Sequence, residues 1–247
     1  MGKQHVQIPN KTVENTTSER GVPDKKYYTD LLVYACLKKY MVAESGISLV
    51  SLRKIADETT ISLGGVQTAI QRLIDAKDIN KIKVSGRNQN GYTFNKTSEK
   101  FEMFDKEFLD NKDLTYLQKA FMIMIQPHLF VDKQLGIGKT TFSSKELSLR
   151  TGLSERVIND RRRELEEGGF ISRRLTTDKD GNSCEALEFN LPKFGQYVLC
   201  KLEELDKNVN ETREELVAMR LEINKLKSII NISTQNTIPV EDAEIVL

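Results

Sequence analysis

The side chains best suited to recognition chemistry lie in an arginine-rich segment near the middle of the chain. Four polar residues of this segment fall at helical spacing on the face opposite its apolar positions: Arg156, Asn159, Asp160 and Arg163. A guanidinium can donate two parallel hydrogen bonds to guanine O6 and N7, and an asparagine amide can pair with adenine N6 and N7. These residue types in this pattern therefore predict contacts with base edges in a DNA duplex.

Two helices and a hairpin must position these side chains. The apolar spacing predicts a helix over residues 144–150, a turn at Gly152 and a second helix over residues 155–167. Ser154 is a suitable N-cap for the second helix, because its hydroxyl oxygen can accept from an orphan amide of the first turn. Beyond Gly168 and Gly169, strands at 171–175 and 186–189 are predicted to pair around Asp180-Gly181.

The same segment carries further arginines, which predict a basic edge: Arg156, Arg161, Arg162, Arg163, Arg173 and Arg174. Arg162 is unusual because its position in the helical pattern faces the core. Either its stem passes the core so that the guanidinium approaches Glu166, or the helix is rotated toward a ligand. We count Ser154, Arg162, Arg173 and Arg174 among the candidate DNA contacts.

The whole pattern occurs a second time, 92 residues earlier. The matched pairs are Ile55 with Leu147, Ile61 with Leu153, Ser62 with Ser154, Val66 with Ile158, Leu73 with Leu165 and Ile79 with Ile171. Every spacing is kept without a gap, which predicts one structural unit used twice. Ile70 stands in the first copy where Arg162 stands in the second.

The first copy has its own candidate surface. Its outward helical positions are Gly64, Gly65, Gln67, Thr68 and Gln71. Its hairpin, expected at 81–85 and 92–94 around Asn90-Gly91, carries Lys81, Lys83 and Arg87. Glycines allow close approach of the backbone to a phosphate, and the hairpin cations suit phosphate better than bases. This surface is equally compatible with protein binding.

Helix, turn, second helix and hairpin together resemble the winged helix-turn-helix superfamily, whose second helix lies in the major groove while the hairpin touches the backbone. The tandem arrangement resembles phage and plasmid replication initiators and transcription regulators. The resemblance implies winged-helix domains at 24–96 and 113–195, with a connector at 97–112.

Residues 196–231 show a sustained heptad pattern. The predicted dimerisation positions are Leu202, Leu205, Val209, Leu216, Met219, Ile223, Leu226 and Ile230. The flanking pairs of a parallel dimer, such as Glu215 with Arg220 and Glu222 with Lys227, are opposite in sign. The pattern favours a parallel homodimeric coiled coil; the alternative is a single amphipathic helix folded back on the rest of the chain.

The terminal segments and the composition bear on which classes of protein are compatible with the sequence. Residues 1–23 are expected to form a flexible tail, and the acidic segment 232–247 either a solvated tail or a docking peptide for a protein partner. The net charge is +1, the three cysteines are scattered, and no apolar run is long enough for a membrane helix. Gly136 to Thr140 ends like a phosphate-binding loop but lacks its first glycine and preceding strand.

The sequence thus predicts a mainly α protein with small β-hairpins, containing two tandem winged-helix domains and a parallel dimeric coiled coil. It is not expected to be an enzyme or to need a cofactor or metal. The expected function is site-specific double-stranded DNA binding by a homodimer that regulates transcription in the cytoplasm, at the nucleoid of a bacterial or phage-infected cell. A replication initiator and a protein-binding scaffold remain alternatives.

Overall fold

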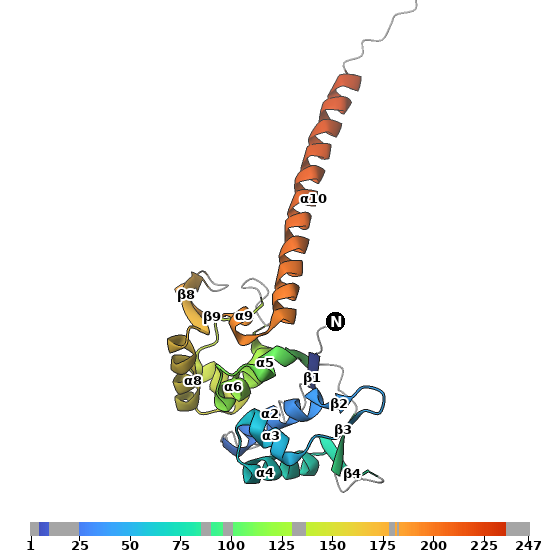
Figure 1. Cartoon of the computed structure of the whole chain (residues 1–247). Helices are drawn as coiled ribbons and strands as arrows, with labels where there is room; N and C mark the ends of the chain where they lie inside the picture. The colour runs from blue at the N-terminus through green and yellow to red at the C-terminus, as the bar shows by residue number, and fades with distance from the viewer. Residues whose placement is uncertain are drawn as a thin grey trace, which may run out of the picture. The chain divides into compact units, whose positions relative to one another are not determined.

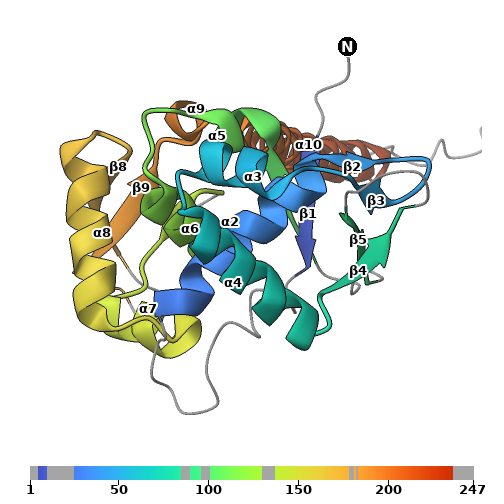
Figure 2. The same cartoon turned by 60° about the horizontal axis from the view of Figure 1, so that its bottom comes forward.

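The first repeat begins with a helix and ends with a hairpin (Figure 1). In the computed structural model, which describes residues 5–9, 25–84, 90–95, 101–129, 137–177, 181 and 183–235, its elements are α2 (Lys25–Lys39), β2 (Met41–Val42), β3 (Ile47–Ser48), α3 (Leu52–Thr59), α4 (Leu63–Asp75), β4 (Ile79–Lys83) and β5 (Asn90–Phe94). The strands form an antiparallel sheet in the order β2-β3-β5-β4. Both α3 and α4 pack on α2, as Figure 2 shows.

The second repeat has the same order of elements. They are α6 (Tyr116–Ile125), the 3-10 turn η1 (Gln126–His128), β7 (Lys139–Thr140), α7 (Ser144–Thr151), α8 (Glu155–Glu167), β8 (Ile171–Thr177) and β9 (Ser183–Phe189). The sheet order β7-β9-β8 corresponds to β3-β5-β4 of the first repeat. The chain is therefore a mixed α and β protein with small antiparallel sheets.

The 92-residue repeat is confirmed in detail, because α7 and α8 each begin and end 92 residues after α3 and α4. Ser62 and Ser154 cap their helices alike, each accepting from the backbone N–H three residues on. Thr59 and Thr151 are buried, and each hydroxyl donates to the carbonyl oxygen four residues earlier, at 2.7 and 2.6 Å. One buried side chain thus closes the end of the first helix of each pair.

The prediction for the first hairpin is wrong at its turn. Asn90 and Gly91 lie inside β5, where they pair with Lys83 and Ile82 of β4. The strands are set by apolar side chains instead: Ile79 is buried opposite Phe94. The second hairpin pairs as predicted and is longer, running from Ile171 opposite Phe189 to Thr177 opposite Ser183.

The predicted flexible tail at 1–23 is wrong for five of its residues. His5–Pro9 forms the strand β1, which pairs antiparallel with β6 (Phe101–Asp105) in the predicted connector. Val6 and Ile8 are buried, so the strand adds to the core. The connector continues as the short helix α5 (Lys106–Asp110), and the rest of the tail lies outside the described residues.

The two repeats share one core within a compact unit that extends to Lys201. Its centre is formed by α2 and α6, which pack against each other. Leu31 to Leu37 of α2 and Ala120 to Ile125 of α6 are buried throughout, because each helix is covered on several sides. Both predicted winged-helix segments, 24–96 and 113–195, fall within this unit, and their division into separate domains stays a prediction.

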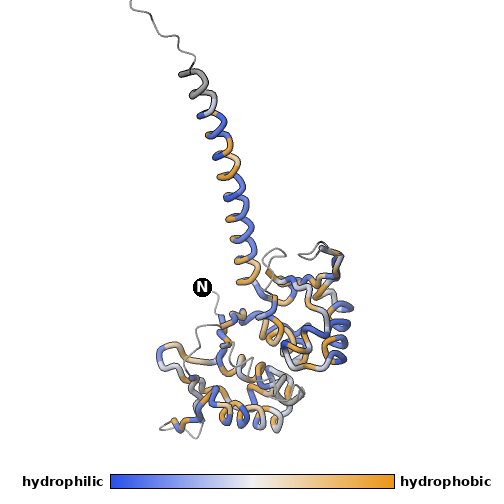
Figure 3. Tube along the Cα trace, turned by 180° about the vertical axis from the view of Figure 1, so that it is seen from behind, coloured by the Kyte–Doolittle hydropathy of each residue, from blue (hydrophilic) through white to orange (hydrophobic). Residues whose placement is uncertain are grey.

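The helix predicted at 196–231 is present as α10 (Tyr197–Gln235), which follows the short helix α9 (Leu191–Phe194). Its first turn belongs to the first unit: Leu199 is buried, and the Val198 N–H donates to Asp105 Oδ2 at 2.8 Å. From Leu202 the helix is a second unit, along which apolar residues recur (Figure 3).

Two predictions for this end of the chain stay untested. Pairing of the apolar residues with a second chain remains a prediction, and Ile230 lies among the residues whose side chains are not described. The predicted acidic tail lies outside the described residues from residue 236 onward, but residues 232–235 continue α10 and do not form a flexible tail.

Candidate nucleic-acid interface

The outward face of α8 presents the side chains predicted for base contacts. Ile158 and Leu165 are fully buried, so Arg156 and Asn159 are exposed on the other side of the helix. Arg163 is also exposed, at 68% of its side chain, with Asp160 Oδ1 3.5 Å from its Nη2. Ser154 is exposed as well, but its Oγ accepts from the Val157 N–H at 3.3 Å and so serves as the helix cap.

Several arginines of the predicted basic edge lie beside carboxylates, which offset their positive charge. Arg161 pairs with Glu164, while Arg174 Nε lies 3.5 Å from Glu188. Arg173 lies between two carboxylates, 3.0 Å from Glu166 and 3.5 Å from Glu185. The hydrogen bond to Glu166 raises the pKa of Arg173. Such exposed pairs are weak, so a phosphate can compete for these arginines, but their net contribution to attraction at long range is small.

Arg162 lies in a different setting from the other predicted DNA contacts. Its side chain is only 12% exposed, and its guanidinium lies beside Ser144 at the start of α7. There Nη1 donates to Ser144 Oγ at 2.7 Å, and Nη2 lies 3.8 Å from Glu185. Burial lowers the pKa of Arg162, followed by the repulsion of Arg173. Because α8 holds this position against the core, Arg162 is largely buried beside the exposed face of α8, and its contact with DNA stays a prediction.

The corresponding face of α4 is exposed and uncharged. Of its five predicted outward residues, Gly65 is half-buried and the other four are exposed: Gly64, Gln67, Thr68 and Gln71. Thr68 Oγ1 donates to the Gly64 carbonyl at 2.8 Å, and Gln71 Nε2 donates to Asp75 Oδ1 at 2.8 Å. A methyl group at Gly64 would meet no atom within 4 Å, so the fold does not require glycine there.

The first hairpin carries cations in a different setting from those of the second. Lys81 and Lys83 are exposed two residues apart on one side of β4. Among the described residues, no carboxylate lies within ion-pair distance of either amine, in contrast to the arginines around α8. The third predicted contact, Arg87, lies outside the described residues.

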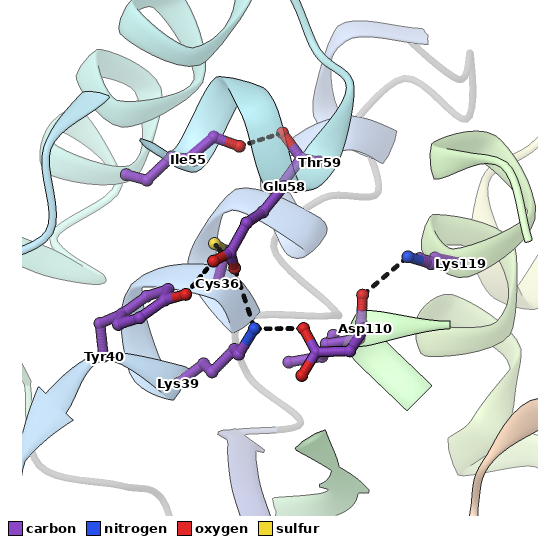
Figure 4. A network of polar contacts seen from close by, with 9 residues as sticks. Cys36, Lys39, Tyr40, Ile55, Glu58, Thr59, Asp110 and Lys119 are labelled. Atoms are coloured by element: carbon purple, nitrogen blue, oxygen red, sulfur yellow. Dashed lines mark hydrogen bonds and ion pairs between the residues drawn. The ribbon is translucent and has the colours of Figure 1, made fainter. Parts of the chain in front are cut away.

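The sequence analysis did not identify Ser144 as a partner of Arg162. It also did not identify a polar network between α2, α3 and α5, which Figure 4 shows. Glu58 accepts from Lys39 at 2.9 Å and from Tyr40, and Lys39 also pairs with Asp110. Beside it, burial first and Glu58 second raise the pKa of Cys36 to about 12, which keeps this thiol protonated. The network joins residues that are 18 to 71 positions apart in the chain, so no local spacing could have indicated it.

Two further features of the described residues bear on the class of protein. No three His, Cys, Asp or Glu side chains in the described ranges are grouped so that they could hold a metal ion. None of the described helices combines the length and apolar character needed to cross a membrane.

The chain matches no protein-family model, no curated protein and no solved structure.

Proposed function

We propose that this chain is a dimeric, site-specific double-stranded DNA-binding protein built on two winged helix-turn-helix units. The observation that carries the proposal is the repeated helix pair and hairpin, in which α4 and α8 both expose a polar outer face. The caps at Ser62 and Ser154 and the buried hydroxyls of Thr59 and Thr151 hold both pairs in the same way. A second helix held on such a support can enter a major groove.

The charges suggest that the two repeats contribute differently. Lys81 and Lys83 have no competing carboxylate in the described part of the chain, so they are suited to phosphate and to affinity. The face of α8 offers Arg156, Asn159 and Arg163, whose hydrogen-bonding groups suit base edges. We therefore assign affinity mainly to the first hairpin and sequence preference mainly to α8.

The second chain of the dimer is expected to cover the apolar seam of α10. Leu205, Val209, Leu216 and Ile223 are at least half exposed within one chain. Val209 and Ile223 at the first core position (a) of the heptad, with Leu205 and Leu226 at the second (d), favour two parallel strands. The described ion pair between Lys207 and Glu211 lies off this seam, so it does not compete with pairing.

The first experiment is selection of bound sequences from a random duplex pool with the full chain, followed by a salt titration of the selected site. We expect a two-fold symmetric motif and an affinity that falls steeply with salt. Absence of enrichment, together with no duplex binding at low salt, would refute the proposal.

Substitutions then separate the two kinds of contact. Lys81→Ala should weaken all duplexes alike and reduce the salt slope by about one, whereas Arg163→Ala should cost about 1–3 kcal/mol and relax the preference at one base pair. Lys112→Ala is the matched control, since Lys112 is an exposed lysine between α5 and α6 and belongs to neither helix pair and neither hairpin. If Arg163→Ala weakens all sequences uniformly, Arg163 contacts phosphate.

The proposed DNA binding is compatible with two biological roles, transcription regulation and replication initiation. One observation favours a function of another class, protein binding. Single selected sites at promoters would support a transcription regulator, and clustered sites in an origin a replication initiator. Leu149 on α7 and Leu175 on β8 are 79% and 80% exposed, which favours a protein-binding scaffold if duplex binding fails.

A further inference from the structure

Three side chains of the second repeat form a hydrogen-bonded chain that ends on the outer face of α8. Arg162 Nη1 donates to Ser144 Oγ at 2.7 Å, and Ser144 Oγ lies 2.5 Å from Asn159 Oδ1. The first member is largely buried, the second is half-buried at the start of α7, and Asn159 is exposed. The chain therefore connects a buried charge to a residue that faces outward.

The chemistry of the three groups sets the direction of these bonds. A guanidinium can only donate, so the Ser144 oxygen accepts from Arg162. The Ser144 hydroxyl is then available to donate to the Asn159 carbonyl oxygen, and 2.5 Å is within the range of an O–H···O bond. The amide is thereby oriented: its oxygen faces Ser144, and its NH₂ group is left to point outward.

This arrangement is a property of the second repeat alone. The positions of Ser144, Asn159 and Arg162 are occupied in the first repeat by Leu52, Gln67 and Ile70. Ile70 is buried in the core and Leu52 packs against it. The second repeat thus has two polar side chains where the first has apolar packing, although Arg162 Nε is buried without a hydrogen-bond partner in the described part of the chain. If these two positions only stabilised the fold, an apolar pair such as Leu52 and Ile70 would be sufficient.

We infer that Ser144 and Arg162 are positioning residues that present the Asn159 NH₂ group to DNA, so that α8 selects a keto base, guanine or thymine, at one position. In the major groove, guanine O6 and N7 and thymine O4 accept hydrogen bonds, whereas cytosine presents only a donating amino group. Adenine offers one acceptor, N7, but its neighbouring N6 amino group needs the amide oxygen that is already occupied by Ser144, so adenine keeps at most one of the two bonds of a bidentate contact. This inference rests on the proposed DNA binding. It replaces the adenine contact expected for a freely rotating asparagine.

The test compares base preferences selected by the full chain and by variants. The wild-type protein should prefer a keto base roughly tenfold at one position, a preference that Asn159→Ala should remove. Ser144→Ala frees the amide to turn over, so adenine should become about as good as guanine there. Ser144→Thr keeps a hydroxyl and should restore the wild-type preference, which loss of stability alone would not explain.

The outcomes distinguish this inference from the proposed function. Specific binding with an adenine preference in the wild-type protein, or an unchanged profile in Ser144→Ala, overturns the inference and leaves DNA binding in place. If no duplex is bound at low salt by the wild-type protein, both fail together. Thermal unfolding followed by circular dichroism verifies that each variant is folded at the temperature of the selection.

Discussion

At the scale of single residues, the two repeats form the same left-handed turn with different residue types. Thr60 and Gly152 are the C-caps of α3 and α7, and both adopt the left-handed conformation, with φ of 56° and 69°. Glycine accepts this region readily, whereas a β-branched residue is strained by its Cβ substituents. The first repeat therefore carries backbone strain that the second avoids.

Exchanging the residue types should change stability in opposite directions. Thr60 is exposed, so Thr60→Gly should raise the free energy of unfolding by about 0.5–1 kcal/mol, the relief of strain exceeding the added freedom of the unfolded chain. Gly152→Ala should lower it by about 1 kcal/mol or more. Urea unfolding measures both, and a loss of stability in Thr60→Gly would contradict the strain argument.

His128 should make the fold sensitive to mild acid. Burial, with the nearby Arg150 second, lowers the pKa of His128 below its usual 6.5. Between the lowered value and 6.5, the unfolded chain binds a proton that the folded chain does not, so this residue's contribution to stability is lost as the pH falls below 6.5. Between about pH 7.5 and about pH 5, the decrease in the free energy of unfolding, measured with urea, should be smaller for His128→Gln than for the wild-type protein. Equal decreases would exclude this role.

At the scale of elements, β1 shows how a distant partner orders a segment with no periodicity of its own. Five residues are too few for a convincing pattern, but pairing with β6 satisfies their backbone groups and buries Val6 and Ile8. The alternation of buried and exposed side chains appears only once this pairing exists.

The contribution of β1 to the free energy of unfolding can be measured with substitutions at two neighbouring residues. Ile8 is 0% exposed, so Ile8→Ala should lower the free energy of unfolding by about 2–4 kcal/mol through lost burial and a cavity. Gln7→Ala, on the exposed side of the same strand, should change it by less than about 0.5 kcal/mol. A tail without structure would give small effects for both.

At the scale of the whole molecule, the chain consists of one unit that contains both repeats and a second that is the exposed part of α10. Packing of α2 on α6 joins the repeats, so α4 and α8 belong to one body. Under the proposed function, a dimer would present two such bodies to one symmetric site.

Dimerisation through the apolar seam of α10 has a matched test. Leu216 and Val217 are adjacent and equally exposed, at 53%, but only Leu216 is on the predicted seam. Leu216→Asp should weaken the dimer by roughly 3 kcal/mol or more because a carboxylate would be buried, and Val217→Asp should leave it intact. Sedimentation should give the mass of a monomer, 28.2 kDa, for the first variant and of a dimer for the second. Equal effects would place the seam elsewhere or refute pairing.

The sequence by itself determined the repeat and the ends of its helices, since caps such as Ser62 and Ser154 and apolar positions at fixed spacing act within a few residues along the chain. It also identified the outward residues of α4 and α8, which follow from helical geometry. Only the tertiary structure decided the order of β1, the shared core of α2 and α6, and the carboxylate partners of the arginines. It also showed that Arg162 turns to Ser144, 18 residues away. These features arise from contacts between distant segments, for which neither a helical period nor a residue's own type provides a signal.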